Sequence, residues 1–180
     1  GKYRPQQTRR VAIDKPGSDE KRILKIGVLL DRVVGKALHE ALQPIWETIY
    51  LEQSYGFRPG RSAWQMLAAV TAGMEAENRW VLAGDDVRKA FDNVPIAQTL
   101  AAHQAATKRT KKSPRMLSRE VLELIGVVLR GFDENSQVGI DQGGCYSPDA
   151  LNLLLHVVHD VPFNAADDTP PWCRYADNLV

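Results

Sequence analysis

Two acidic segments constrain this chain more than any other feature of its sequence. They are Gly84–Asn93 and Trp172–Val180, and each places an Asp at the end of a short apolar run. The run Trp80–Ala83 predicts a strand that leads into Asp85 and Asp86, and Ala176-Asp177-Asn178 predicts a tight turn before a returning strand. If folding brings the two Asp residues together, their carboxylates can hold divalent metal ions. Taken singly, each Asp is equally typical of a turn or a helix cap.

Composition favours one ordinary soluble domain. The chain has 180 residues, of which 44% are apolar and 25% charged, and this is enough to form a core. No apolar run reaches the roughly 18 residues of a membrane helix, and the basic N-terminus is not a signal peptide, so we expect a cytoplasmic protein without a membrane partner. Cys145 and Cys173 lack metal-site spacing and are expected to be reduced thiols.

The charge is distributed unevenly, although the net charge is only +1. Residues 1–36 carry ten Lys or Arg against four acids, and Lys108–Lys112 form a second basic cluster that Arg115 and Arg119 continue. The segment from Glu120 onward is acidic. A basic arm beside an acidic, metal-holding half suits a phosphate-bearing substrate, whereas any one of these lysines taken alone favours a solvated surface.

Hydrophobic periodicity predicts an α+β fold of short strands and separate helices. We expect a hairpin within residues 1–30 around the Pro16–Asp19 turn, and a helix capped by Asp31 that Pro44 kinks or ends. Further helices are expected after Ser62, from Pro95 to about Ala106, after Ser118 and from Ser147, with a short strand at Gln137–Ile140.

Six segments, in order, resemble the motifs of bacterial reverse transcriptases of the group II intron type. Tyr175–Asn178 resembles the family's Tyr-Ala-Asp-Asp box, and Asp86–Asn93 resembles its first catalytic motif. The others are Val11–Pro16, Asp31–Val34, Ser54–Ser62 and Gly139–Pro148.

The resemblance implies a right-hand polymerase fold with fingers and an incomplete palm. It places fingers at residues 1–78, with the basic hairpin at 1–30, and palm at 79–180. Because the chain begins at Gly1 and stops within the catalytic hairpin, we expect a fragment of a longer protein, weak or inactive by itself.

The resemblance also implies the site residues. Asp86, Asp177 and the main-chain carbonyl of Val87 would hold Mg²⁺, with Mn²⁺ as a possible substitute. Lys15, Arg22, Phe91 and Gln142 would contact the nucleotide, with Phe91 excluding a 2′-hydroxyl. The alternatives without a nucleotide role are a solvated hairpin for Lys15 and Arg22, and an aromatic residue of the palm core for Phe91.

Two further arginines lie in the loop Ser54–Ser62. The resemblance implies that Arg58 and Arg61 either contact the template backbone or brace the fingers, and both readings stay open.

One residue departs from the family pattern in the catalytic box itself. Asn178 stands where the family has a second, less essential Asp, so it brings an amide oxygen without charge. We expect lowered activity or altered metal use. The implied function is RNA-directed DNA synthesis by two-metal nucleotidyl transfer with RNA template, DNA primer and dNTP, in an intron-encoded maturase that also binds intron RNA. The alternatives are a catalytically decayed RNA-binding module and a polymerase of a defence or CRISPR-linked system.

Overall fold

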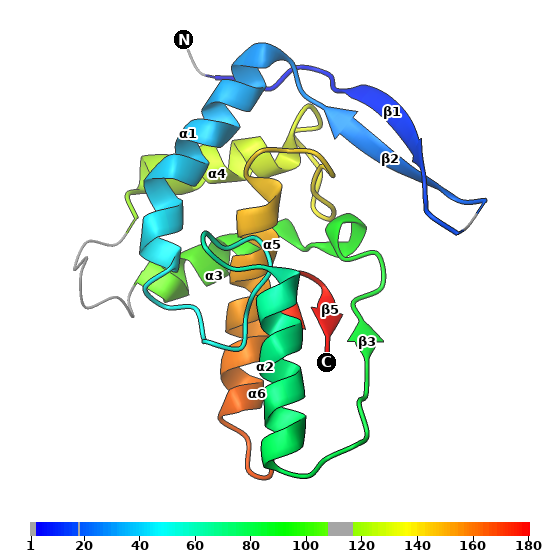
Figure 1. Cartoon of the computed structure of the whole chain (residues 1–180). Helices are drawn as coiled ribbons and strands as arrows, with labels where there is room; N and C mark the ends of the chain where they lie inside the picture. The colour runs from blue at the N-terminus through cyan, green and yellow to red at the C-terminus, as the bar shows by residue number, and fades with distance from the viewer. Residues whose placement is uncertain (1–2, 18, 108–116) are drawn as a thin grey trace.

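The computed structural model describes residues 3–17, 19–107 and 117–180, and it confirms an α+β fold (Figure 1). The strands are β1 (Arg9–Asp14), β2 (Lys21–Ile26), β3 (Asp85–Asp86), β4 (Arg174–Tyr175) and β5 (Asn178–Leu179). The helices are α1 (Leu29–Trp46), α2 (Ala63–Ala76), α3 (Ile96–Thr107), α4 (Arg119–Arg130), α5 (Ser147–Leu155) and α6 (Val161–Asn164). The remaining elements are a 3₁₀ turn, η1 (Phe91–Asn93), and a π-helix, η2 (His156–Asp160).

The hairpin β1–β2 extends from one end of the molecule, as predicted from the turn at Pro16–Asp19 (Figure 1). Its six residue pairs run from Arg9 opposite Ile26 to Asp14 opposite Lys21. Most of the hairpin is exposed, but its base is attached to the body. The Lys25 amide donates to the Gln142 carbonyl at 2.8 Å, and the Lys25 ammonium contacts Asp141 at the same distance.

Helices α1, α3, α4 and α5 enclose one hydrophobic core. Its side chains come from all four helices, and Trp46, Ile125 and Leu153 are completely buried. The core therefore joins α1, predicted as part of the fingers, to helices predicted as part of the palm. The proposed boundary at residues 78 and 79 stays a prediction.

A buried histidine lies at the centre of this core. The Nδ1–H of His103 donates to the Thr99 carbonyl at 2.7 Å, so Nε2 is free to accept from the Tyr146 hydroxyl at 2.8 Å. Burial lowers the pKa of His103 to about 4, which keeps the ring neutral near pH 7.

Asp31 does not cap α1 and Pro44 does not end it, whereas a kink at Pro44 stays a prediction. The helix begins at Leu29, and Asp31 lies inside its first turn, where the carboxylate accepts from the Tyr3 hydroxyl and the Gln6 amide. Pro44 lies within the helix, which continues to Trp46. Burial of Leu42 and Trp46 against the core outweighs the backbone hydrogen bond that a proline removes.

Two predicted strands were also wrong. Residues 80–83 are exposed and extended without a strand partner, and pairing begins only at Asp85, where β5 reaches it. Within residues 137–140 only Val138 forms a β-bridge, with Pro95. The other backbone hydrogen bonds of this segment go to Phe91 in η1, to Val94 and to Ile96 at the start of α3. Short apolar runs are therefore poor predictors of strand length here.

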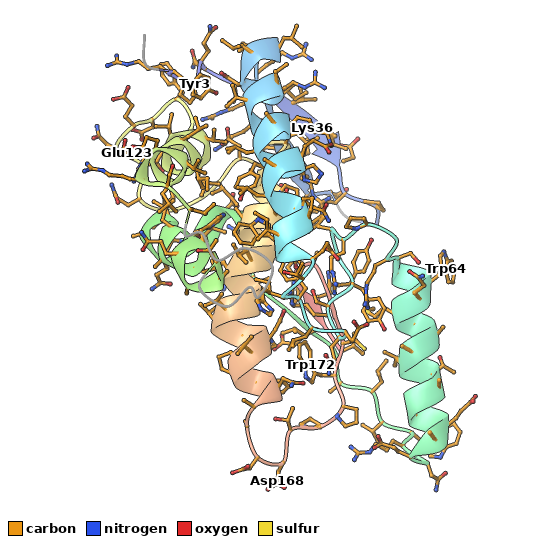
Figure 2. The ribbon with its side chains drawn as sticks, turned by 90° about the vertical axis from the view of Figure 1, so that its left-hand side faces the viewer. Tyr3, Lys36, Trp64, Glu123, Asp168 and Trp172 are labelled. Carbon is orange, nitrogen blue, oxygen red and sulfur yellow. The ribbon has the colours of Figure 1, made fainter. Side chains whose placement is uncertain are left out.

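The second sheet has the order β3–β5–β4 and lies between α2 and the helical rod formed by α5, η2 and α6 (Figure 2). The Ser62 hydroxyl caps α2 as predicted, accepting from the Gln65 amide. Trp64 points outward from this helix and is 81% exposed, whereas Trp172 points inward beside the sheet (Figure 2).

No helix in the described parts of the chain has the length and apolar character needed to cross a membrane. The predicted basic cluster at Lys108–Lys112 and Arg115 lies outside the described residues.

Candidate catalytic edge and nucleotide site

The two acidic segments meet on neighbouring strands of the second sheet. Asp86 pairs with Asn178 in the antiparallel register of β3 and β5, and the Val87 amide donates to the Asp177 carbonyl at 3.0 Å. The predicted turn is also present, since residues 176 and 177 connect β4 to β5. The structure thus brings together all four residues that the sequence predicted for metal binding and catalysis.

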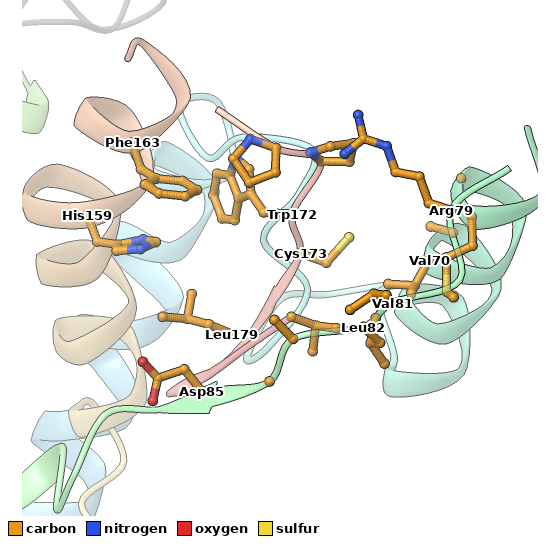
Figure 3. A pocket seen from close by; sticks show the side chains of 18 residues that line it. Val70, Arg79, Val81, Leu82, Asp85, His159, Phe163, Trp172, Cys173 and Leu179 are labelled. Atoms are coloured by element: carbon orange, nitrogen blue, oxygen red, sulfur yellow. The ribbon is translucent and has the colours of Figure 1, made fainter. Parts of the chain in front are cut away.

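The register also separates Asp85 from Asp86. Successive strand residues point to opposite faces, whereas directly paired residues share a face. Asp85 and its partner Leu179 line an apolar hollow of about 640 Å³, together with His159 and Trp172 (Figure 3). Asp86 therefore faces the other side with Asn178, and its role as the metal ligand stays a prediction.

The turn that carries Asp177 is packed against the loop Ser54–Ser62. The Tyr55 amide donates to the Arg174 carbonyl, and the Arg174 amide donates to the Gln53 carbonyl, each at 2.8 Å. A Cβ added to Gly56 would lie 2.1 Å from the Ala176 nitrogen. The glycine is therefore required by close backbone approach, because its own φ is not positive.

The predicted nucleotide-binding residues lie on two parts of the fold, and no pocket described for the structure is lined by any of them. Lys15 and Arg22 flank the exposed tip of the β1–β2 hairpin, and Lys15 forms an ion pair with Glu20 at 2.6 Å that lowers the pKa of that carboxyl. Gln142 is half-buried in the loop to which β2 is bonded. This attachment of β2 connects the hairpin to the Gln142 loop.

Phe91 is half-buried at the start of η1. Its ring packs edge-on against Phe57 with 6.4 Å between centroids, and its carbonyl accepts from the Ile140 amide at 2.9 Å. The residue also contacts the hydrophobic core. A packing role and a steric gate are both compatible with this position, so the gate stays a prediction.

Arg58 lies in a bracing position, and its contact with a template stays a prediction. Its side chain is 4% exposed, its guanidinium donates to Glu47 and to the carbonyls of Leu51 and Ser54, and it lies over the Tyr50 ring. Four of its five N–H donors are thereby bonded within the protein, which supports the bracing role.

Arg61 is likewise turned back onto its own loop. It is bonded to the Glu52 carbonyl and carboxylate and lies over the Tyr55 ring. It is more accessible than Arg58, and two of its five N–H donors are bonded to Glu52, so both the template contact and the bracing role stay predictions.

The catalytic edge offers hard oxygen ligands for a metal ion. The side chains of Asp86 and Asp177 and the Val87 carbonyl could supply such oxygens, and the Asn178 amide could supply a neutral one. Among the described residues there is no cluster of three or more His, Cys, Asp or Glu that could form a closed protein cage. Two carboxylates on an exposed edge instead suit an ion such as Mg²⁺, which keeps waters and substrate phosphates as ligands.

Sequence reasoning missed the buried polar side chains beneath the turn. Arg174 and Asp160 are each 0% exposed and are bonded to one another through two pairs of atoms, at 2.8 and 2.5 Å. A local sign was available in the sequence, because the helix residues before Asp160 are mostly apolar apart from His156 and His159. A lone acid in an apolar helix face requires a buried partner.

Comparison with known proteins identifies the family. A family model described as "Reverse transcriptase (RNA-dependent DNA polymerase)" matches residues 13–180. The chain is 31% identical over 166 residues to Protein YkfC of Escherichia coli (strain K12), covering 87% of this chain and 41% of the relative. It is 32% identical over 162 residues to the Group II intron-encoded protein LtrA of Lactococcus lactis subsp. cremoris, covering 87% of this chain and 25% of the relative.

A third relative is the "Uncharacterized 91 kDa protein in cob intron" of Schizosaccharomyces pombe, 31% identical over 148 residues, with 82% of this chain and 18% of the relative covered. The paired acidic strand ends and the helical support define a polymerase palm, and the chain belongs to the reverse transcriptase family. It spans less than half of the length of the curated relatives it matches.

Proposed function

We propose that this chain carries the catalytic edge and nucleotide-binding hairpin of an RNA-directed DNA polymerase. The observation that carries the proposal is the pairing of β3 with β5, which places Asp86 and Val87 beside Asp177 and Asn178. The family match supports the polymerase class. The substrates would be an RNA template, a DNA primer and dNTP.

Each group at the site would have a distinct role in nucleotidyl transfer. Asp86, Asp177 and the Val87 carbonyl would hold Mg²⁺ or Mn²⁺, and the bound metal supplies activation of the primer 3′-hydroxyl and stabilisation of the leaving pyrophosphate. Lys15 and Arg22 would bind the triphosphate oxygens, for which an ammonium and a bidentate guanidinium are suited. Phe91 would exclude a 2′-hydroxyl, and Gln142 would line the nucleotide pocket.

The parent protein is proposed to be intron-encoded, cytoplasmic and to bind its intron RNA. This rests on the name of the relative LtrA, a group II intron-encoded protein, and on the 32% identity. Binding of intron RNA and a cytoplasmic location are properties of the whole protein, and both remain proposals for it.

A second candidate function is favoured by one residue. Asn178 lies directly opposite Asp86, where a carboxylate would add charge for the metal, so a decayed RNA-binding module is a specific alternative. The decisive experiment is RNA-templated primer extension by the natural protein that contains this chain. Extension that is measurable with Asn178, rises with Asn178→Asp and disappears with Asp177→Ala supports the polymerase.

The opposite result would select the alternative. If neither the wild-type protein nor the Asn178→Asp variant extends a primer in Mg²⁺ or Mn²⁺, while RNA binding persists and weakens with salt, the chain is an RNA-binding relic.

A further inference from the structure

The turn of residues 176 and 177, called the catalytic turn below, is held at its base by the buried guanidinium of Arg174. Beyond its double contact with Asp160, Arg174 donates from Nη1 to the Asn152 side-chain oxygen and to the Ala176 carbonyl, each at 2.7 Å, and from Nη2 to the Ser54 hydroxyl at 3.0 Å. The Ala176 carbonyl belongs to the peptide that connects to Asp177. Arg174 therefore joins the helical rod directly to the residue that precedes the proposed metal ligand.

The π-helix η2 explains how Asp160 reaches Arg174. Asn152 and Asp160 both contact this guanidinium, yet they are eight residues apart and would differ by about 80° around a regular α-helix. A π-turn takes one additional residue to close, which returns Asp160 to the face of Asn152. Pro162 favours this interruption, since it has no N–H to donate to the carbonyl four residues earlier.

The turn needs such support because Ala176 is in a strained conformation. Its φ is +57°, in the left-handed region that non-glycine residues rarely adopt. A residue persists there only when the surrounding contacts determine it. Two contacts do so here: the Arg174 bond to its carbonyl and the close approach of Gly56 to its nitrogen.

We propose that Asp160 and Arg174 are a positioning pair for the metal ligand Asp177. The pair fixes Ala176 in its left-handed conformation and thereby sets where the Asp177 carboxylate stands relative to Asp86. The metal-binding part of this inference rests on the proposed function, whereas the ordering of the turn can be tested without a metal.

Two measurements on the 180-residue chain separate these parts. Hydrogen exchange of the Val87 amide reports whether the turn is in place, because this amide donates to the Asp177 carbonyl. Broadening of the Val87 and Asn178 amide resonances by Mn²⁺ reports metal binding. We expect Asp160→Asn to accelerate Val87 exchange at least tenfold and to weaken Mn²⁺ binding at least tenfold.

An apolar replacement of both partners distinguishes positioning from general stability. Asp160→Leu with Arg174→Met removes both charges together, so that no unpaired charge stays buried, and apolar replacements of buried ion pairs are often neutral for stability. We expect its thermal midpoint to recover toward wild type while Val87 exchange stays fast and Mn²⁺ binding stays weak. If Val87 exchange and Mn²⁺ binding both returned to wild-type values along with the thermal midpoint, the inference would be overturned.

Deletion of Val158 tests the role of the π-turn even if the replacements do not fold. Val158 is 54% exposed, and its removal places Asp160 seven residues after Asn152, on the same face of a regular α-helix. We expect Val87 exchange to remain within threefold of wild type, and faster exchange would contradict this reading of η2. If the wild-type chain shows no broadening with Mn²⁺, the proposed function fails, and the exchange rates still decide the positioning role.

Discussion

Replacement of Gly56 by alanine is expected to displace the catalytic turn. The added Cβ would lie 2.1 Å from the Ala176 nitrogen and 2.8 Å from its Cα, whereas real Cβ contacts essentially never fall below 3.0 Å. Both neighbours are backbone atoms, so no side chain can rotate away. The turn has to retreat by about 1 Å, and a displacement of that size can reduce catalysis about 100-fold.

The cost in stability can be bounded from the same geometry. Overpacking a well-packed site typically destabilises a protein by about 1–3 kcal/mol. Urea unfolding of the chain would measure this loss, and primer extension by the natural protein would measure the loss of activity. Mn²⁺ binding by the chain should weaken in parallel, because Asp177 follows the displaced residue.

Gly73→Ala is the matched control. Gly73 lies in α2, and a Cβ there would meet nothing within 4 Å. Alanine in a helix interior is favoured by roughly 0.5–1 kcal/mol over glycine, so this variant should be as stable as wild type or more so. A Gly56→Ala protein with wild-type stability and activity would refute the packing of residues 53–56 against the turn.

Three other predictions follow from single residues. The pKa of His103 is about 4 in the folded state and near 6.5 in the unfolded state, so the unfolded state binds the proton first as pH falls and stability is lost between those values. In urea unfolding, wild type should therefore lose about 2 kcal/mol more stability than His103→Gln between pH 7.5 and 5.0. Equal losses in the two proteins would contradict this pKa. Phe91→Ala should raise rNTP relative to dNTP incorporation on one preparation of the natural protein, and an unchanged ratio would make Phe91 a packing residue only. Ser62→Ala should lower the free energy of unfolding by about 1 kcal/mol through loss of the α2 cap, unless the 3.3 Å bond to the Gln65 amide contributes nothing.

Local chemistry made part of the fold predictable from sequence. The turns at residues 16–19 and 176–177 follow from residues that favour tight turns, and the Ser62 cap follows from its hydroxyl. The approach of Asp86 to Asp177 was expected only from the family resemblance. In the structure it depends on the pairing of two strands separated by about ninety residues along the chain, which no local pattern encodes.

The errors share one physical cause, which is tertiary contact. One alternative for Pro44 was that it ends a helix, but burial of Trp46 carries the helix past it. Residues 80–83 were expected to form a strand, but pairing with β5 starts only at Asp85. For Arg58 the sequence left a template contact and a bracing role open, and only the placement of Glu47 beside it shows how the side chain is buried.

The support of the turn was missed for the same reason. Gly56 is an ordinary loop glycine in the sequence, and its role appears only when Ala176 is placed against it. The partnership of Asp160 and Arg174 depends on the extra residue of η2, which shifts the helical face. An acid after a run of apolar residues was the one local sign that a buried partner exists.

The most direct test of the central claim is Mn²⁺ titration of the 180-residue chain and three isosteric variants, followed by paramagnetic relaxation. Asp86→Asn and Asp177→Asn should each reduce Mn²⁺ affinity at least tenfold, because both carboxylates serve one site. Asp85→Asn should bind as wild type does, since Asp85 faces the apolar hollow while its retained oxygen can still accept from the Asp86 amide. Wild-type affinity in either of the first two variants, or an equal loss in Asp85→Asn, would contradict a shared metal site at Asp86 and Asp177.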